Sequence, residues 1–218
     1  MNTLIFSDTH LGPVFEEKKF NFLKKRIEEA DQVIINGDFW EGYLYSFDQF
    51  VTSPWSLLFP YLKNKNTVYI YGNHDKEIQS SQKTNLFSSV QTSRYTQKLN
   101  GHSLVFEHGN RLWNMRDAEV KRNTKVELAT YISDKIERIL TRNYTKYKKH
   151  LLSPFNNTIK SKLRKELKPN EIYLCGHTHL AEFNMKEQFI NSGIVKHGVA
   201  QYLEISGTTV TPKEEWYD

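Results

Sequence analysis

Five short apolar stretches of this sequence each end in polar residues that can bind a metal ion or move a proton. The most complete stretch spans residues 69–75 (YIYGNHD), where Gly72 ends an apolar run and Asn73, His74 and Asp75 follow at once. A buried strand that ends in this way is typical of sites at the carboxyl edge of α/β sheets. The same plan recurs at residues 4–10 (LIFSDTH), 33–38 (VIINGD), 104–109 (LVFEHG) and 173–179 (YLCGHTH). We therefore expect five strand ends to form the rim of one site.

The order of the expected elements indicates an α/β fold. Residues 2–6 and 32–36 have the composition of buried strands, and residues 16–30 between them have helical spacing of apolar residues. A strand, a helix and a strand in this order predict a parallel pair with a right-handed crossover. Further strands are expected at residues 68–71, 93–98, 102–106, 172–175, 189–191 and 201–205.

Residues 110–170 interrupt this alternation and concentrate the positive charge. They contain 16 Lys/Arg and 6 Asp/Glu, whereas the rest of the chain has 14 basic and 19 acidic residues. Helical spacing predicts helices at 117–143 and 155–167, with a break at Ser153-Pro154. We expect one domain over residues 1–218, with 110–170 as an inserted helical hairpin, or lid. Its charge favours an anionic partner, and a solvated lysine-rich hairpin is the alternative.

Length and composition indicate the number of domains and the cellular compartment that we expect. A length of 218 residues suits one domain with a substantial core. The single cysteine, Cys175, excludes an intrachain disulfide and favours a reducing compartment, and its apolar surroundings predict a buried, inert thiol. We see no signal-peptide pattern and no apolar run of membrane-spanning length, so we expect a cytoplasmic protein.

The polar residues at the strand ends are suitable ligands for a transition metal. Asp8 and His10, like His177 and His179, are two residues apart, so each pair faces one side of an extended chain. The pair of Asp8 and His10 is a weak signal alone and the pair of His177 and His179 is a moderate one, and the coincidence of five strand ends decides the interpretation. Nitrogen and oxygen donors without cysteine fit Mn, Fe or Zn, and Mg is a further option. The candidate donors are Asp8, His10, Asp38, Asn73, His108, His177 and His179.

Seven donors exceed the needs of one ion. Two divalent ions ~3.5–4 Å apart that share a carboxylate would use them all. Such a centre attracts a phosphate oxygen and lowers the pKa of bound water towards roughly 7, so that water can attack phosphorus. A phosphoesterase of this kind needs no serine or cysteine nucleophile.

In order, the five stretches resemble the motifs of the calcineurin-like metallophosphoesterase superfamily. The resemblance implies a two-sheet β-sandwich flanked by helices. It implies that one metal ion, with Mn as the first expectation, is held by Asp8, His10, Asp38 and His179. It implies that the other is held by Asp38, Asn73, His108 and His177, with Asp38 bridging the two ions.

The same resemblance implies a catalytic role for His74, which would contact the phosphate or assist the leaving group rather than bind metal. Asp75 is expected to orient His74, with a turn-capping role as the alternative. The protein phosphatase branch is disfavoured, because its Gly-Asp-x-x-Asp-Arg-Gly motif is absent at residues 37–42 (GDFWEG).

A small bacterial branch, the UDP-2,3-diacylglucosamine pyrophosphatases, is more similar. It shares the compact length, the aromatic and acidic residues after Gly-Asp, and a basic helical insertion after His-Gly. The chain departs from that branch at His74, where those enzymes carry arginine. The expected substrate contacts are Arg111, Arg116 and Trp40.

The expected partner is a phosphate-containing small molecule or a lipid-linked substrate. A basic, amphipathic hairpin would also contact an anionic membrane, which here would be its inner face. Two other functions are compatible with the residues. A nuclease would use the basic and aromatic side chains for nucleic acid, and a catalytically silent scaffold would keep the fold alone.

Overall fold

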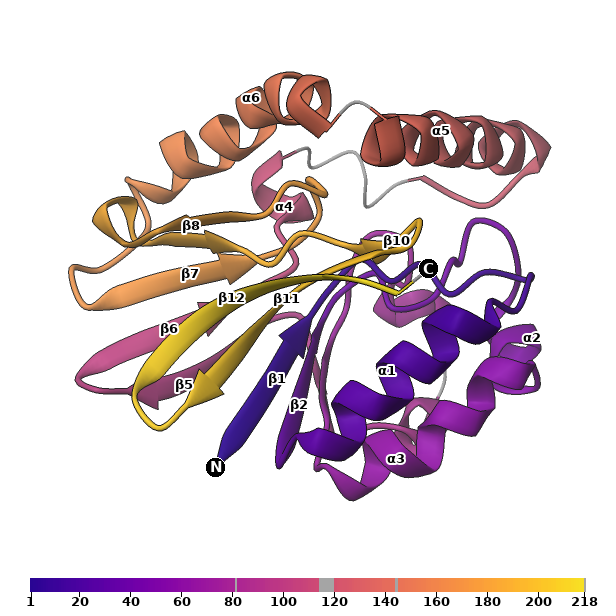
Figure 1. Cartoon of the computed structure of the whole chain (residues 1–218), viewed down its shortest axis with the longest axis horizontal. Coiled ribbons are helices and arrows are strands. Elements are labelled where there is room, and N and C mark those ends of the chain that lie inside the picture. The colour runs from indigo at the N-terminus through magenta and orange to yellow at the C-terminus, as the bar shows by residue number, and fades with distance from the viewer. Residues whose placement is uncertain (81, 114–119, 144, 218) are drawn as a thin grey trace.

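Two β-sheets pack face to face in the computed structural model, which describes residues 1–80, 82–113, 120–143 and 145–217 (Figure 1). The first sheet has the order β10 (Val195–Lys196), β11 (Val199–Ser206), β1 (Asn2–Phe6), β2 (Gln32–Asn36), β3 (Val68–Ile70) and β4 (Val90–Thr92), and β12 (Thr209–Trp216) pairs with β11. The second has the order β5 (Tyr95–Leu99), β6 (His102–Phe106), β7 (Glu171–Cys175), β9 (Phe189–Asn191) and β8 (Glu182–Asn184).

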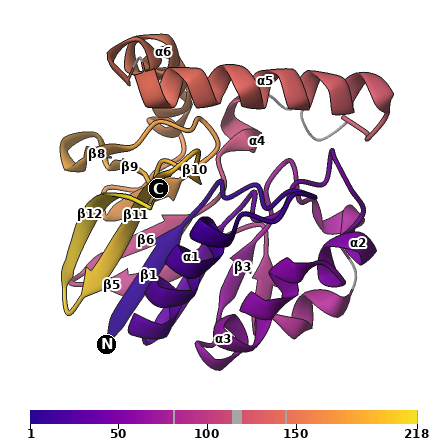
Figure 2. The ribbon, with the colours of Figure 1, turned by 45° about the vertical axis from the view of Figure 1, so that its right-hand side comes forward.

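Helices cover the outer faces of both sheets. Helices α1 (Glu17–Glu29), α2 (Phe47–Val51) and α3 (Phe59–Asn64) cover the first sheet, and α4 (Asn110–Trp113) and α6 (Thr145–Leu163) cover the second. Helix α5 (Thr124–Asn143) lies across the edge of the molecule beside α6 (Figure 2). Short 3₁₀ helices occur at η1 (Pro54–Leu58), η2 (Glu77–Gln79), η3 (Gln82–Leu86) and η5 (Met185–Glu187). The expected α/β fold, two sheets flanked by helices, is confirmed.

The central strands β1, β2 and β3 of the first sheet are largely apolar because both of their faces are buried. In β1, Leu4 and Phe6 pack under the helices, whereas Ile5 packs against the second sheet. Ile34 of β2 and Leu174 of β7 lie in the same layer between the sheets. Burying each such side chain contributes about 1.5–3 kcal/mol, so this layer holds the two sheets together.

The five polar strand ends meet at one edge because their strands run in the same direction within each sheet. Strand β1 is parallel to β2 and β2 to β3, while β6 is parallel to β7 in the other sheet. Helices α4 to α6 follow β6 and precede β7, where the hairpin is expected. Among the described residues, no helix combines the length and hydropathy that a membrane span requires.

The expected break at Ser153-Pro154 is wrong, because α6 continues through Pro154. Proline has no N–H to donate to the carbonyl four residues earlier, which belongs to His150. The hydroxyl of Ser153 donates to that carbonyl at 3.3 Å and partly replaces the missing bond. Strands β4, β8, β10 and β12 were not expected from the sequence.

Candidate metal centre

The loops at the strand ends hold several candidate ligands in an uncommon backbone conformation. Asp8, His10 and Asp38 have φ values of 51°, 42° and 52°, and His177 and His179 have values of 66° and 58°. Non-glycine residues rarely occupy this left-handed region, and each one costs about 1–3 kcal/mol that the surrounding structure must offset. Their concentration at this edge indicates that the loops are shaped to aim these side chains.

Two motif glycines leave room for carboxylates from other strands. A Cβ at Gly72 would collide with Oδ1 of Asp38, and one at Gly176 would collide with Oδ2 of Asp8. Each glycine therefore allows a carboxylate from the end of another strand to lie directly against its backbone.

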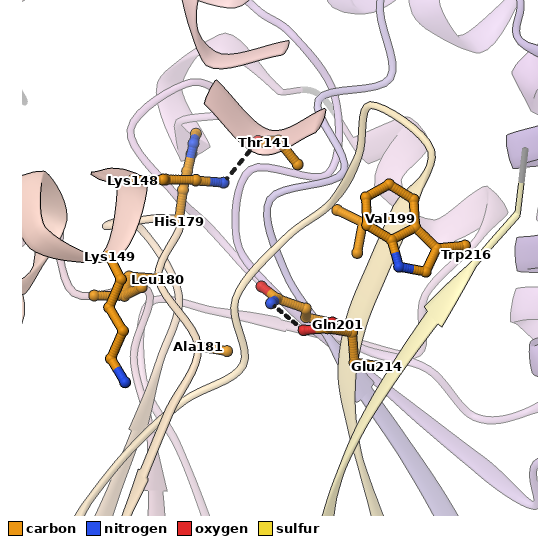
Figure 3. Close-up of a pocket in the computed structure, with 10 residues that line it drawn as sticks. All are labelled: Thr141, Lys148, Lys149, His179, Leu180, Ala181, Val199, Gln201, Glu214 and Trp216. Carbon is orange, nitrogen blue, oxygen red and sulfur yellow. Dashed lines mark hydrogen bonds between the residues drawn. The ribbon is translucent and has the colours of Figure 1, made fainter. Parts of the chain in front are cut away.

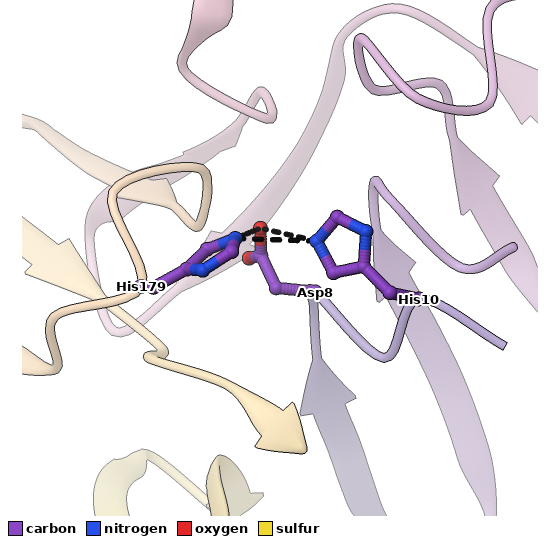
Figure 4. A group of neighbouring side chains, drawn as sticks. All are labelled: Asp8, His10 and His179. Atoms are coloured by element: carbon purple, nitrogen blue, oxygen red, sulfur yellow. Dashed lines mark hydrogen bonds and ion pairs between the residues drawn. The ribbon is translucent and has the colours of Figure 1, made fainter. Parts of the chain in front are cut away.

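One group of candidate ligands consists of Asp8, His10 and His179 (Figure 4). Nε2 of His179 lies 3.2 Å from Oδ1 of Asp8 and 3.2 Å from Nε2 of His10. Asp8 and His10 follow β1, whereas His179 follows β7, so the two sheets build this group together. Its donor atoms all lie within 4.8 Å of one another, which is close enough to surround one ion.

A second group consists of Asp38, His108 and His177, with Asn73 beside it. Nε2 of His108 lies 3.1 Å from Oδ2 of Asp38, and Nδ1 of His177 lies 2.9 Å from Oδ1 of Asn73. Oδ2 of Asp38 is also 3.7 Å from Nε2 of His10, a member of the first group. The carboxylate of Asp38 therefore lies between the two groups.

Four of the six side chains in the two groups are deeply buried and those of His177 and His179 are partly buried, so their charges interact strongly. Burial would lower the pKa of His108, but the carboxylates of Asp38 and Asp8 raise it to about 10. Burial would raise the pKa of Asp38, but the charges of His108 and His74 lower it well below its ordinary value. The pKa of His177 falls to about 3, first through burial and then through the charge of His108. The two carboxylates thus favour a positive charge between them.

A further layer of contacts orients the imidazole rings. Nδ1 of His10 donates to Glu41 at 2.9 Å, Nδ1 of His108 to the carbonyl of Asn36 at 2.9 Å, and Nδ1 of His179 to Glu137 at 2.6 Å. In each ring Nε2 is then left as the atom that faces the centre. Neither Glu41 nor Glu137 was among the site residues expected from the sequence. Glu41 could have been noticed because it follows Asp38 closely, whereas Glu137 lies in α5 and carries no motif.

The expected partnership between Asp75 and His74 is not observed. The carboxylate of Asp75 accepts the backbone N–H groups of Asp38, Phe39 and Gly72 at 3.0, 2.6 and 2.6 Å, which is the turn-capping alternative. Glu41 contacts His74 instead, with Oε1 2.6 Å from Nδ1. Asp75 therefore ties the loops after β2 and β3 together, and Glu41 orients His74.

Of the three expected substrate contacts, the structure contradicts one. Trp40 is 1% exposed and its ring stacks on Phe50 in the core, so a substrate has no access to it. Arg111 pairs with Glu107 at 3.2 Å and with Glu166 at 2.8 Å, which anchors α4 near the end of α6. Arg116 lies outside the described residues.

Two cavities flank the centre. One of about 630 Å³ has His74, His177 and His179 on one side and Trp113, Leu152 and Phe155 of the hairpin among its other lining residues. Another of about 320 Å³ lies beyond His179, between the hairpin and the strands β11 and β12 (Figure 3). In Figure 3 Lys148 of α6 points towards Thr141 of α5, to which its ammonium group donates at 3.0 Å. Both candidate ligand groups thus lie beneath the hairpin.

The chain matches one protein-family model over most of its length. A model of the calcineurin-like phosphoesterases matches residues 1–181. No curated protein matches the chain.

Several solved structures have a similar fold. An archaeal phosphodiesterase is 15% identical with a TM-score of 0.50, over 99% of this chain and 100% of that one. The phosphoesterase YfcE from E. coli is 13% identical with a TM-score of 0.48, over the whole of both chains. The nuclease MPE from Pseudomonas putida is 14% identical with a TM-score of 0.47, over 97% of this chain and 87% of that one.

Proposed function

Because the chain belongs to the calcineurin-like phosphoesterases, a family of metal-dependent hydrolases, we propose that it hydrolyses a phosphodiester or pyrophosphate bond with two divalent metal ions. The position of Asp38 carries this proposal. Its Oδ2 atom lies 3.1 Å from Nε2 of His108 and 3.7 Å from Nε2 of His10, so one carboxylate faces both groups of candidate ligands. A carboxylate shared in this way is the usual bridge of a two-metal hydrolase.

The residues present fit such ions. Each group offers one carboxylate and two imidazoles, a donor set that suits Mn, Fe or Zn, and we propose Mn²⁺ as the first ion to test. Nε2 of His108 is buried 3.1 Å from Oδ2 of Asp38 without the geometry of a hydrogen bond, and an ion bound by both atoms would satisfy them. When bound, the two ions would polarise the phosphoryl oxygens and lower the pKa of the attacking water.

His74 is the proposed proton donor to the leaving group. Burial opposes its protonation, but the carboxylates of Glu41 and Asp38 raise its pKa above the ordinary value of 6.5, which favours the charged ring more than in a free imidazole. Its Nδ1 atom contacts the carboxylate of Glu41. Nε2 is therefore the atom that would donate a proton to the oxygen of the leaving group in the adjoining cavity. A positioned imidazolium contributes about 10²–10⁴-fold to such a step.

The hairpin wall of the larger cavity supports a substrate with an apolar or aromatic part. The rings of Trp113 and Phe155 lie 4.4 Å apart, and Leu152 lines the same space. A nucleoside-diphosphate sugar that carries acyl chains, such as UDP-2,3-diacylglucosamine, combines a pyrophosphate with such groups. We propose this substrate class for the site.

Helix α5 supports a peripheral membrane contact on the cytoplasmic side. Ile132, Ile136 and Ile139 are 48%, 53% and 54% exposed, and they form a stripe along the outward face of the helix. Lys125 and Lys135 are exposed on the same face by helical spacing. An apolar stripe with lysines among its residues suits an anionic lipid surface.

A flotation assay tests the membrane contact. The protein should float with vesicles that contain anionic lipid, and I132D/I136D should remain unbound while it still hydrolyses a soluble substrate. Equal flotation of both proteins, or none with the wild type, would contradict the contact.

A substrate panel with Mn²⁺ tests the activity. It should contain a phosphomonoester, a model phosphodiester, nucleoside-diphosphate sugars, UDP-2,3-diacylglucosamine, and single-stranded and duplex DNA. We expect the diester and the acylated pyrophosphate to be cleaved, and His74→Ala and Asp38→Asn to lose this activity with the fold intact. Preferred cleavage of DNA, with binding that weakens steeply with salt, would establish the nuclease alternative instead. Wild-type rates in either variant would overturn the proposed site.

A further inference from the structure

The face of α5 that points into the molecule is polar, although the helix covers the candidate metal centre. Thr130, Asp134, Glu137 and Thr141 follow one another at helical spacing on this face, opposite the exposed isoleucine stripe. Asp134 lies 2.6 Å from the ammonium group of Lys196 on β10. Helix α5 therefore docks onto the body of the protein through ion pairs and hydrogen bonds rather than through an apolar face.

Glu137 is the most enclosed acidic residue of that contact, with its side chain 15% exposed. Its Oε1 atom lies 2.6 Å from Nδ1 of His179. Its Oε2 atom lies 3.3 Å from Nε2 of His197 and 3.4 Å from Nζ of Lys196. The ammonium group of Lys148 on α6 lies 3.6 Å from Oε1. One carboxylate thus connects both helices of the hairpin with β10 and with the loop that carries His179.

The bond from Nδ1 of His179 to Glu137 decides which ring nitrogen faces the centre. It leaves Nε2 directed at Oδ1 of Asp8 and at Nε2 of His10, each 3.2 Å away. An imidazole that binds a metal ion is commonly held by a carboxylate on its other nitrogen, which selects the tautomer and increases the basicity of the donor. The corresponding partner of His10 is the carboxylate of Glu41, in the loop after β2, and that of His108 is the backbone carbonyl of Asn36, at the end of β2. The partner of His179 comes instead from the inserted hairpin.

We propose that Glu137 positions His179, so that the docked hairpin completes the metal centre as well as covering it. The inference rests on the proposed function, because it takes His179 to be a metal ligand. It gives the inserted helices a second role, since any movement that lifts α5 away would remove the orienting partner of one ligand. Metal affinity at the group of Asp8, His10 and His179 therefore depends on hairpin docking.

Metal titration of the full chain tests the proposal. Mn²⁺ binding is measured by calorimetry on wild type, Glu137→Ala and the isosteric Glu137→Gln, after circular dichroism has checked that each variant folds. We expect Glu137→Ala to weaken one binding step by about 10–100-fold while the other changes little, with Glu137→Gln intermediate. The proton of His179 Nδ1, followed by ¹⁵N NMR in the metal-free protein, should lose its strong hydrogen-bond signature in Glu137→Ala.

Asp134→Asn is the matched control. It removes a carboxylate from the same face of α5 and breaks the ion pair with Lys196, but among the described residues Asp134 makes no hydrogen bond or ion pair with His179. Near wild-type affinity in Asp134→Asn supports a role specific to Glu137. Equal weakening in both variants, or wild-type affinity in Glu137→Ala and Glu137→Gln, would overturn the proposal. Failure of the wild type to bind any divalent ion would instead overturn the proposed function.

Discussion

Oε1 of Glu41 lies 2.6 Å from Nδ1 of His74, and this contact sets the charge and the orientation of the proposed proton donor. The other oxygen of the same carboxylate accepts a bond from His10 at 2.9 Å, so Glu41 links the proposed donor to a candidate metal ligand. A residue that belongs to none of the recognised strand-end motifs thus connects two of them.

Replacing Glu41 should impair catalysis. In Glu41→Gln the charge that holds the proton on His74 is lost, and the amide oxygen cannot accept from both rings as well as a carboxylate does. We expect kcat for a model phosphodiester to fall by about 10–100-fold with a smaller change in KM. The alkaline limb of the pH–rate profile should move to lower pH. Glu77→Gln, which alters an exposed carboxylate in the nearby helix η2, is the control and should keep both the rate and the profile.

The stability of the metal-free protein should depend on pH through the same pair. Burial opposes the charge of Glu41, but His74 and His10 lower its pKa below 4.5, so its contribution is present above that pH and is lost as pH falls. The pKa of His74 lies above 6.5, so its contribution is present below pH 6.5 and is lost as pH rises through the folded-state pKa. The pair therefore contributes most between these two values.

Urea unfolding in the presence of a chelator, from about pH 4 to pH 9, measures this dependence. In Glu41→Gln the unfolding free energy should change less with pH than in the wild type, on both the acidic and the alkaline side. If the difference in unfolding free energy between the two proteins were constant across this range, the pair would contribute nothing through its charges.

Adding a methyl group at Gly176 should disturb the first ligand group. In Gly176→Ala the new Cβ would collide with Oδ2 of Asp8 and with the side chain of Ser7, so the Asp8 carboxylate would have to leave its present position. We expect a loss of about 1–3 kcal/mol of unfolding free energy and a clear loss of Mn²⁺ affinity. Gly101→Ala is the matched control, because its Cβ would meet no neighbouring atom although φ is +79°. It should lose some stability but bind metal normally. Normal metal affinity in Gly176→Ala would show that Asp8 does not need its present position.

Bound metal should stabilise the fold, because the ions would neutralise the two buried carboxylates. Mn²⁺ at about 100 times Kd adds roughly 2.7 kcal/mol to the unfolding free energy for each site. A chelator should reverse this gain and remove activity. Asp38→Asn should lose more than about 100-fold in activity, since it removes a direct ligand rather than an orienting partner. It should also lose most of the thermal shift with Mn²⁺. A full shift in that variant would be incompatible with Asp38 as the shared ligand.

Local pattern was enough to predict the strands that lead into the candidate metal centre and the residues that follow them. The apolar runs at Asn2–Phe6, Gln32–Asn36 and His102–Phe106 are strands with the expected bounds. Each run is continuous because its strand is buried on both faces, and the polar residues beyond it lie at one edge because parallel strands end together. Cys175 is buried, as its apolar neighbours predicted.

Contacts between distant parts of the chain explain the features that the local sequence pattern did not predict. Trp40 was expected to face the substrate, but the helices over the first sheet enclose it. The apolar positions of α5 predicted a helix without indicating that their face points outward and that Thr130, Asp134 and Glu137 point inward. Several basic residues of the hairpin, including Lys160 with Glu182 and Glu187, pair with acidic residues of the core, which accounts for part of the segment's excess charge.

The sequence by itself determined which side chains stand at the carboxyl ends of the strands, because a buried strand and the turn after it depend on residues adjacent in the chain. Only the tertiary structure decided how those side chains are grouped and held. Asp8 and His179 come together only because the two sheets pack against each other. The contact that orients His179 comes from Glu137 of α5, a helix inserted between β6 and β7. Such relations depend on how separate elements dock, which the spacing of residues along the chain does not encode.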